Sequence, residues 1–164
     1  MRIVRETPGP GHESVWDYPR PPRAERTGRH LIIRHAGQTL AETRRAIRTL
    51  ETSHPPTYYF PPDDVDAAML RPASGSSFCE WKGHARYVDV VMGGDVLPRV
   101  GWYYPDPTPG FSLLRDHIAL YAAPFDEVLV DGEQVTPQPG GFYGGWITSD
   151  LAGPFKGIPG SRFW

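Results

Sequence analysis

Residues 76–105 read SSFCEWKGHARYVDVVMGGDVLPRVGWYYP and hold three strand-like runs, SSF, HARYVDVVM and RVGWYYP, separated by glycine and proline turns. Short apolar runs bounded by turn residues are typical of β-strands. Two further runs follow in HIALYAA (117–123) and DEVLVDG (126–132). Many short strands separated by turns predict an antiparallel all-β fold, a small sandwich or barrel.

The chain before this stretch carries the same pattern. TGRHLIIRHAGQTLAET (27–43) reads as a hairpin that turns at Ala36 and Gly37. RRAIRTLET (44–52) alternates with period two, and its β-branched threonines favour a strand over the competing helix across 40–50. Asp63 is placed as the N-cap of one short helix that ends near Leu70.

Composition narrows the class of protein. The 164 residues suit a single domain, and 17 Lys+Arg against 19 Asp+Glu give a net charge of −2, which disfavours a nucleic-acid binder. We find neither an apolar signal region nor an apolar run near the roughly 20 residues of a membrane helix. One cysteine excludes an intramolecular disulfide and a multi-thiolate zinc site. We expect a cytoplasmic protein without metal or cofactor.

The two ends of the chain differ from the middle in amino-acid composition. Residues 1–28 are polar and proline-rich and read as an N-terminal arm, which leaves residues 29–135 as the β core. Residues 136–164 are rich in glycine but contain six aromatic side chains, which a solvated linker would not carry. The tail is therefore expected to pack on the core or on a partner chain, and a homodimer is one form of the latter.

Cys79 has two interpretations. As a nucleophile or redox thiol it needs a nearby cation, such as Lys82 or His84, to stabilise the thiolate. As a structural residue it is a small buried apolar side chain, as free cysteines usually are. In an extended CEWKG segment Cys79 and Trp81 share one face and Lys82 takes the other, which favours the structural interpretation unless Gly83 breaks the strand.

Glu51 ends an alternating strand, directly before the loop of LETSHPPTYYF (50–60). A carboxylate there is either a solubilising residue or a general acid/base or hydrogen-bond acceptor in a pocket. Aromatic residues are numerous along the strands, and they either line a ligand cleft or form a thick aromatic core. They are Tyr58, Tyr59, Trp81, Tyr87, Trp102, Tyr103 and Tyr104.

An ordered set of motifs resembles a known family. The motifs are ESVWDYPRPP, LETSHPPTYYFPPDDV, CEWKGHARY, WYYPDP, IALYAAPFDEVLVDGEQV and GGWITSDLAGPFKG, and together they cover almost the whole chain. In this order they resemble the bacterial family called domain of unknown function 427. A nucleotidyltransferase label is attached to that family, but this sequence has neither a phosphate loop nor a paired-aspartate metal motif.

The resemblance implies a small all-β fold similar to the β-tent (Mss4-like) domains. Those domains bind zinc through two cysteine pairs, so this chain, with one cysteine, is expected to lack the metal. Glu80 departs from the family, which often has proline there, and its charge disfavours a thiolate at Cys79. The family's recurring positions fall on Glu51, Thr52, Pro56, Tyr58, Pro61, Asp64, Cys79, Trp81, Lys82, Gly83, Ala85, Tyr87, Trp102, Tyr104, Pro105, Asp131 and Gly132.

Three hypotheses about function follow. The first is a small-molecule pocket lined by Glu51, Tyr58, Trp81, Lys82, Tyr87 and Trp102. In it, Lys82 contacts an anionic group and pairs with Glu51, which is the acceptor or general base. The second is an enzyme that uses Cys79 as nucleophile or redox thiol. The third is an interaction module that offers the aromatic tail to a partner or to a second copy.

Overall fold

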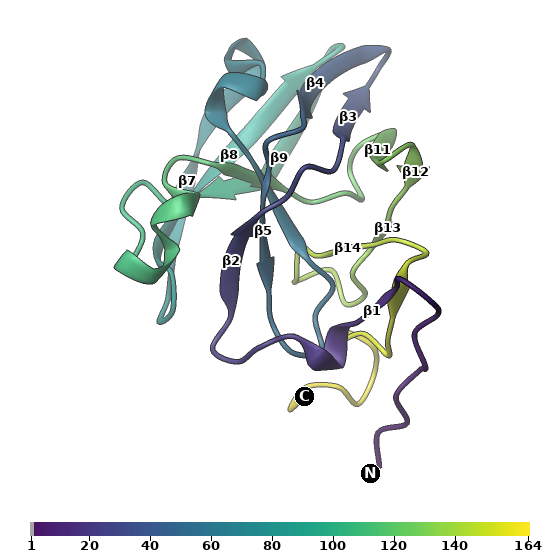
Figure 1. The fold of residues 1–164 in the computed structure, drawn as a ribbon. Coiled ribbons are helices and arrows are strands. Elements are labelled where there is room, and N and C mark those ends of the chain that lie inside the picture. Colours follow the sequence, from purple (N-terminus) through teal and green to yellow (C-terminus); the bar gives the residue numbers. More distant parts are fainter. Residues whose placement is uncertain (1) are drawn as a thin grey trace.

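The computed structural model describes residues 2–164, and strands dominate them (Figure 1). The larger of two main sheets has seven strands in the order β2–β5–β6–β10–β9–β8–β7, and every neighbouring pair is antiparallel. Its strands are β2 (Arg23–Arg26), β5 (Ile47–Leu50), β6 (Thr57–Phe60), β10 (Ile118–Leu120), β9 (Asp95–Tyr103), β8 (Gly83–Met92) and β7 (Leu70–Cys79).

The smaller main sheet has four antiparallel strands in the order β12–β11–β3–β4. They are β12 (Glu133–Gln134), β11 (Glu127–Val130), β3 (Leu31–His35) and β4 (Gln38–Thr43). The prediction of an antiparallel all-β fold is confirmed. The barrel alternative is wrong, because β2 and β7 are the two open edges of the seven-stranded sheet.

The main core lies between these two sheets. Leu31, Ile33 and Val128 of the smaller sheet are fully buried and cluster with Val90, Leu120 and other apolar residues of the larger one. The predicted hairpin is confirmed: β3 and β4 are joined by Ala36 and Gly37, at φ of 50° and 74°. Two successive positive φ values match the primed turn that suits the right-handed twist of paired strands.

The predicted helix from Asp63 to Leu70 is wrong. Two short 3₁₀ turns, Pro62–Asp64 (η2) and Ala67–Met69 (η3), occupy this stretch instead. Val65 lies between them in extended conformation and bridges to Ala41 of β4, which interrupts any continuous helix. Two further 3₁₀ segments, Val15–Asp17 (η1) and Pro109–Leu114 (η4), are the other helical elements of residues 2–164.

Both ends of the chain contribute strands. β2 lies inside the segment assigned to the N-terminal arm, so the larger sheet begins before residue 29. β1 (Glu13–Ser14) pairs in parallel with β15 (Leu151–Ala152), and β13 (Thr136–Pro137) pairs with β14 (Trp146–Ile147). Trp146 is buried in the main core, which places the tail on the sheets, whereas Phe142 and Phe163 stay exposed.

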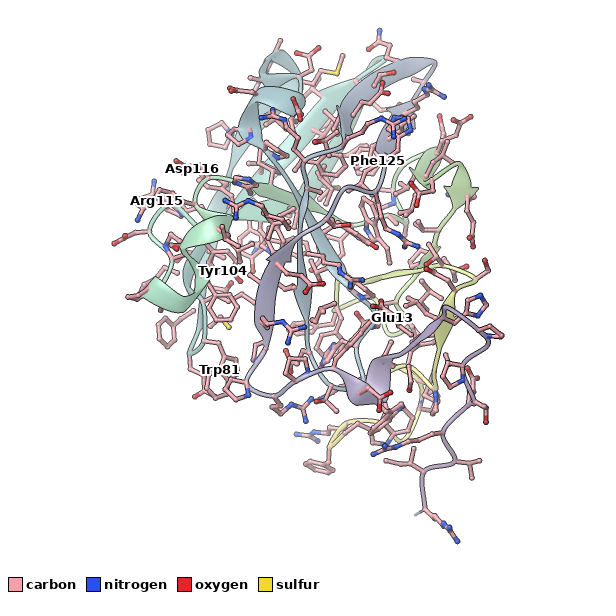
Figure 2. All side chains as sticks on the ribbon, viewed as in Figure 1. Glu13, Trp81, Tyr104, Arg115, Asp116 and Phe125 are labelled. Atoms are coloured by element: carbon pink, nitrogen blue, oxygen red, sulfur yellow. The ribbon has the colours of Figure 1, made fainter. Side chains whose placement is uncertain are left out.

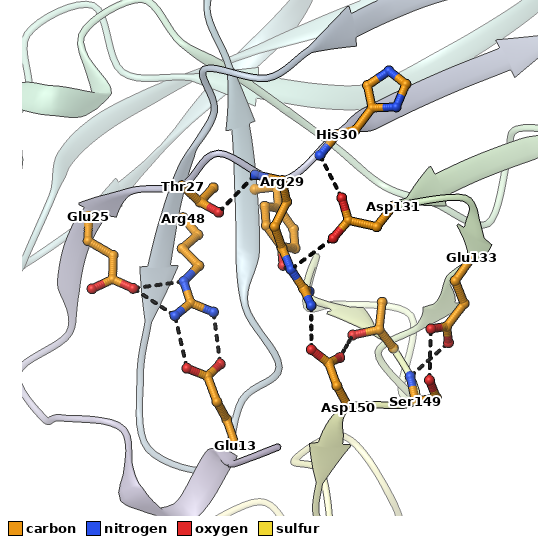
Figure 3. Close-up of polar contacts among 12 residues, drawn as sticks. Glu13, Glu25, Thr27, Arg29, His30, Arg48, Asp131, Glu133, Ser149 and Asp150 are labelled. Carbon is orange, nitrogen blue, oxygen red and sulfur yellow. Dashed lines mark hydrogen bonds and ion pairs between the residues drawn. The ribbon is translucent and has the colours of Figure 1, made fainter. Parts of the chain in front are cut away.

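Two arginines tie these ends to the sheets (Figure 3). Arg48 of β5 donates to both carboxylate oxygens of Glu13 at 2.9 and 3.0 Å, and its hydrogen bond lowers the pKa of that carboxyl group. Arg29 binds Asp150 of the tail and Asp131 after β11. Since both arginines are partly buried, these pairs fix the ends more firmly than exposed ion pairs would. No helix in residues 2–164 is long and apolar enough to cross a membrane.

Candidate functional site

The face of the seven-stranded sheet that points away from the main core carries a cavity of about 400 Å³. Successive side chains in a strand point to opposite faces, so alternate residues of each strand reach it. Thr49 of β5, Tyr59 of β6 and Ala85 of β8 are such residues, and the sheet also contributes Thr57, Ser77, Cys79, Tyr87, Trp102 and Tyr104. Beside it, η4 covers the same face through Phe111 and Leu114.

The floor is aromatic. Tyr87 and Trp102 are directly opposite each other on β8 and β9, and Tyr59 is opposite Ala119 of β10, which in turn is opposite Trp102. The small side chain of Ala119 leaves room for its neighbours, so Trp102 Nε1 reaches the Tyr59 hydroxyl at 3.4 Å. Tyr121 flanks Trp102 with its ring centroid 4.9 Å away. Trp102 stands edge-on to Tyr59, at an interplanar angle of 89°, and is tilted by 55° against Tyr121, so the rings form an uneven aromatic surface.

Lys82 enters the cavity because the chain reverses tightly beside it. Cys79 is paired with Gly83 across β7 and β8, so residues 80–82 form the whole turn. Gly83 has φ of 108°, which residues with a side chain rarely adopt, and the backbone oxygen of Asp106 would lie 3.3 Å from an added Cβ. The expected break at Gly83 is present, and it brings Lys82 and Cys79 to the same cavity.

The Lys82 ammonium is half-buried and has no hydrogen bond or ion pair within residues 2–164. Although burial opposes the charge, the pKa of Lys82 is raised, because the groups of Tyr59, Cys79 and Glu51 favour the protonated amine. Lys82 is therefore an ammonium at neutral pH, which rules it out as a neutral base or amine nucleophile there. It is a fixed positive charge that faces a cavity.

The predicted ion pair between Lys82 and Glu51 is wrong. Glu51 lines the cavity but lies 3.4 Å from Arg20 Nη2 and 3.6 Å from His54 Nε2. Arg20 also donates to the carbonyl of Thr52 at 2.8 Å, which holds it beside Glu51. The carboxylate is thus occupied on the rim, and Lys82 is left without it.

His54 completes this rim as a neutral imidazole. Burial lowers the pKa of His54 to about 4; Glu51 opposes this change, and the charges of Lys156, Arg20 and Lys82 add to it. Its tautomer follows from its partners. The Gln138 amide oxygen accepts from Gly145 N, so its nitrogen donates to His54 Nδ1 at 3.0 Å. The ring proton is then on Nε2, on the side of Glu51.

The tail closes the remaining wall. Tyr143 packs edge-on against His54 at 4.9 Å between ring centroids, and the Tyr121 hydroxyl donates to the carbonyl of Phe142 at 2.9 Å. Gly144 lies so close to Trp102 that an added Cβ would come within 2.2 Å of the indole. Lys156 also lines the cavity, but its ammonium donates to the backbone oxygen of Trp164 at 3.0 Å.

Two predicted pocket residues lie elsewhere. Tyr58 points to the opposite face of the sheet from its neighbour Tyr59, where it is buried in the main core and accepts a hydrogen bond from Arg29 at 3.3 Å. Trp81 lies at the tip of the β7–β8 hairpin, on the outer margin of the molecule in Figure 2, with 39% of its surface exposed. The other four predicted residues, Glu51, Lys82, Tyr87 and Trp102, line the cavity together.

Cys79 is partly buried: it packs, as expected, against the buried cluster that includes Tyr59 and Ala85, and it also lines the cavity. Tyr104 is its neighbour there, and burial raises the pKa of that phenol, with the charges of Tyr59 and Cys79 acting in the same direction. His84 points to the other face and packs against Phe78 at 4.9 Å, so it is not placed to assist the thiol. Across residues 2–164, His, Cys, Asp and Glu side chains form no group of three that could hold a metal.

The family assignment follows from sequence comparison. The profile of the family described as "Domain of unknown function (DUF427)" matches residues 23–131. This match spans more than half of the chain, from β2 to the residue after β11. The chain therefore belongs to this family, and the predicted resemblance is confirmed. No curated protein is matched by the chain.

Sequence reasoning missed part of the wall. His54, Gln138, Tyr143 and Lys156 come from loops that are up to about a hundred residues apart, and no local pattern joins them. Tyr59 was recognisable in principle, because Tyr58 and Tyr59 must point to opposite faces of a strand. The sequence does not say which of the two faces is the apolar core.

Proposed function

We propose that the cavity binds a small molecule with a negatively charged group, and that Lys82 is the residue that contacts this group. The observation that carries the proposal is an ammonium without a partner in residues 2–164, half-buried beside an aromatic floor. The Glu51 carboxylate favours the charged amine but does not pair with it, so an anion that occupies the cavity would form the missing ion pair. The volume of about 400 Å³ lies within the usual range for ligand sites, about 300–1,000 Å³.

Glu51 and His54 supply the hydrogen-bonding groups on the rim of the cavity. The carboxylate is held by Arg20 and His54, and the imidazole proton points toward it. A neutral hydrogen-bonding group of the ligand fits this rim better than a second anion, which the carboxylate would repel. Glu51 is thus the proposed acceptor, as the sequence suggested.

The test is a thermal-shift screen of a chemically diverse library against the wild-type protein, Lys82→Met and Lys156→Met. A compound that binds the folded protein raises its melting temperature. We expect anionic hits whose shift disappears in Lys82→Met and is reduced less in Lys156→Met, since that ammonium already has a partner. If no compound gives a shift that depends on Lys82, the proposal fails.

A second candidate is an enzyme in which Cys79 is the nucleophile. The observation that favours it is that the thiol and Lys82 line the same cavity, since reactive cysteines lie beside cationic groups. Its test is the rate of alkylation of the native protein by iodoacetamide at neutral pH. Rapid stoichiometric labelling that slows in Lys82→Met supports a reactive thiol, and labelling no faster than that of a free thiol removes this candidate.

A further inference from the structure

The charge of the cavity wall limits the ligand to a single negative group. Its lysines and carboxylates are Lys82, Lys156 and Glu51, and their charges sum to one positive charge because His54 is neutral. Lys156 is committed to the backbone oxygen of Trp164, and Glu51 to Arg20 and His54. Lys82 alone is left, so it can balance one anionic oxygen group and no more.

The same wall lacks the groups that proteins use for phosphate. No arginine is among the residues that line it. Arg20 is held by Glu51 and the Thr52 carbonyl, and Arg99 by the Tyr87 ring and the Ser74 carbonyl, so two-pronged hydrogen bonding to a phosphate is not provided by a free guanidinium. Its one glycine, Gly144, packs against Trp102 and is not part of a glycine-rich loop at a helix N-terminus. One lysine balances the single negative charge of a carboxylate, whereas it balances only one of the two negative charges of a phosphate dianion.

The floor of the cavity is aromatic and its side chains are held in place, with the Arg99 guanidinium 4.3 Å from the centre of the Tyr87 ring. Trp102 is fixed by its hydrogen bond to Tyr59, by Tyr121 and by Gly144, and Tyr87 is held opposite it by a hydrogen bond of 2.8 Å to Ser77. Side chains that are fixed in this way lose little freedom when a ligand binds, which favours affinity for a ring stacked on them. Ala85, two residues before Tyr87 on β8 and on the same face, adds only a small side chain to the floor.

From these three observations we infer that the ligand is a small aromatic carboxylic acid, with its carboxylate on Lys82 and its ring on the floor of Tyr87 and Trp102. This inference rests on the proposed function and makes it narrower. It also separates the site from nucleotide chemistry, since a nucleotide would bring at least one phosphate to a wall that has a single uncommitted cation.

The experiment compares three compounds with one ring system: 2-naphthoate, the neutral 2-naphthamide and 2-naphthyl phosphate. Affinities are measured by isothermal titration calorimetry, and the indole N–H signal of Trp102 in NMR spectra reports whether each compound occupies the cavity. We expect 2-naphthoate to bind at least about tenfold more tightly than the other two, in line with the strength of a hydrogen bond to a charged group. In Lys82→Met its affinity should fall to that of the amide.

The outcomes separate this inference from the proposed function. If 2-naphthyl phosphate binds more tightly than 2-naphthoate and loses its affinity in Lys82→Met, the site still binds anions, but the inference that the ligand is a carboxylic acid is wrong. Equal binding of acid and amide overturns the role of charge. If none of the three shifts the Trp102 signal, the aromatic acid is wrong, and the proposed function then stands only if the diverse screen finds an anion that depends on Lys82. Unchanged circular dichroism and a melting temperature of Lys82→Met at or above that of the wild type serve as the folding control, since the variant loses an unpaired half-buried charge.

Discussion

The two faces of the seven-stranded sheet differ in what covers them. One face packs against the four-stranded sheet and is closed by apolar side chains such as Val90 and Leu120. The other is covered only in part, by η4 and the tail, and keeps a cavity with hydroxyl, thiol, amine and carboxylate groups. Adjacent tyrosines in β6 show the division, since Tyr58 belongs to the first face and Tyr59 to the second. The closed face forms the apolar core, and the open face carries the polar groups on which the proposed function rests.

The largest expected effect is on the closed face. Trp146 is 1% exposed, packs against Tyr58 and Phe60, and donates to the carbonyl of Leu120 at 3.1 Å. Replacing it with alanine should lower the free energy of unfolding by about 3–5 kcal/mol, because a large cavity is left. Urea unfolding measures this loss. Phe142→Ala, in the same tail but exposed, is the control and should change stability by less than about 0.5 kcal/mol. Equal losses would mean that the tail is not anchored through Trp146.

A pH effect of similar size is expected on the open face. Folding lowers the pKa of His54 from its ordinary value of about 6.5 to about 4, so the unfolded chain binds the proton more readily. Stability from this residue is therefore complete above pH 6.5 and is lost as the pH falls toward 4, by up to about 3 kcal/mol. Unfolding curves of the wild type and His54→Gln over this range isolate the effect as their difference. A difference that does not vary with pH would contradict a neutral buried His54.

The two tyrosines of β6 test the division directly. Tyr58→Phe removes the hydroxyl that accepts from Arg29 and should cost about 1 kcal/mol of stability while leaving ligand affinity unchanged. Tyr59→Phe removes a hydroxyl next to Lys82 and Trp102, and we expect its main effect on ligand affinity. Chemical denaturation and calorimetry together measure both quantities. The comparison breaks if Tyr58→Phe weakens binding as much as Tyr59→Phe does.

The smallest effect is expected at the hairpin tip. Trp81 does not line the cavity, so Trp81→Ala should change ligand affinity by less than about twofold, within the ordinary range of surface substitutions. Trp102→Ala removes a fixed part of the floor and should weaken an aromatic ligand by about 1–3 kcal/mol, the usual value of a stacked ring. Calorimetric titration of both variants gives the answer. A large loss of affinity in Trp81→Ala would mean that Trp81 contacts the ligand after all.

The fold was predictable where strands have an apolar face. The hairpin at Ala36–Gly37 and the runs of β8 to β11 carry clear alternation or turn signals, and they form as expected. β2 reads RAER and lies at a sheet edge with little burial, so no apolar pattern marks it. The expected helix failed because Val65 pairs with Ala41, a contact across more than twenty residues that local propensity does not contain.

The candidate site was predictable in its centre and not at its rim. Lys82 ends a tight turn that Gly83 closes at a positive φ, so the sequence contains both the cation and the reason for its orientation. Glu51 pairs with Arg20, which is more than thirty residues away in a segment interpreted as an N-terminal arm, so the sequence did not indicate this pair. Tyr58 was placed wrongly because a strand covered on both faces shows no alternation that would identify the apolar one.

The central claim is that the open face binds an anion through Lys82 and not through the thiol. The most direct measurement is the affinity of one ligand from the screen for Cys79→Ala and Lys82→Ala, by calorimetry at pH 7. The account predicts at most a few-fold change in the first variant and a loss of about 1.5–3 kcal/mol in the second, the value of a hydrogen bond to a charged group. Lost binding in Cys79→Ala with retained binding in Lys82→Ala would contradict it.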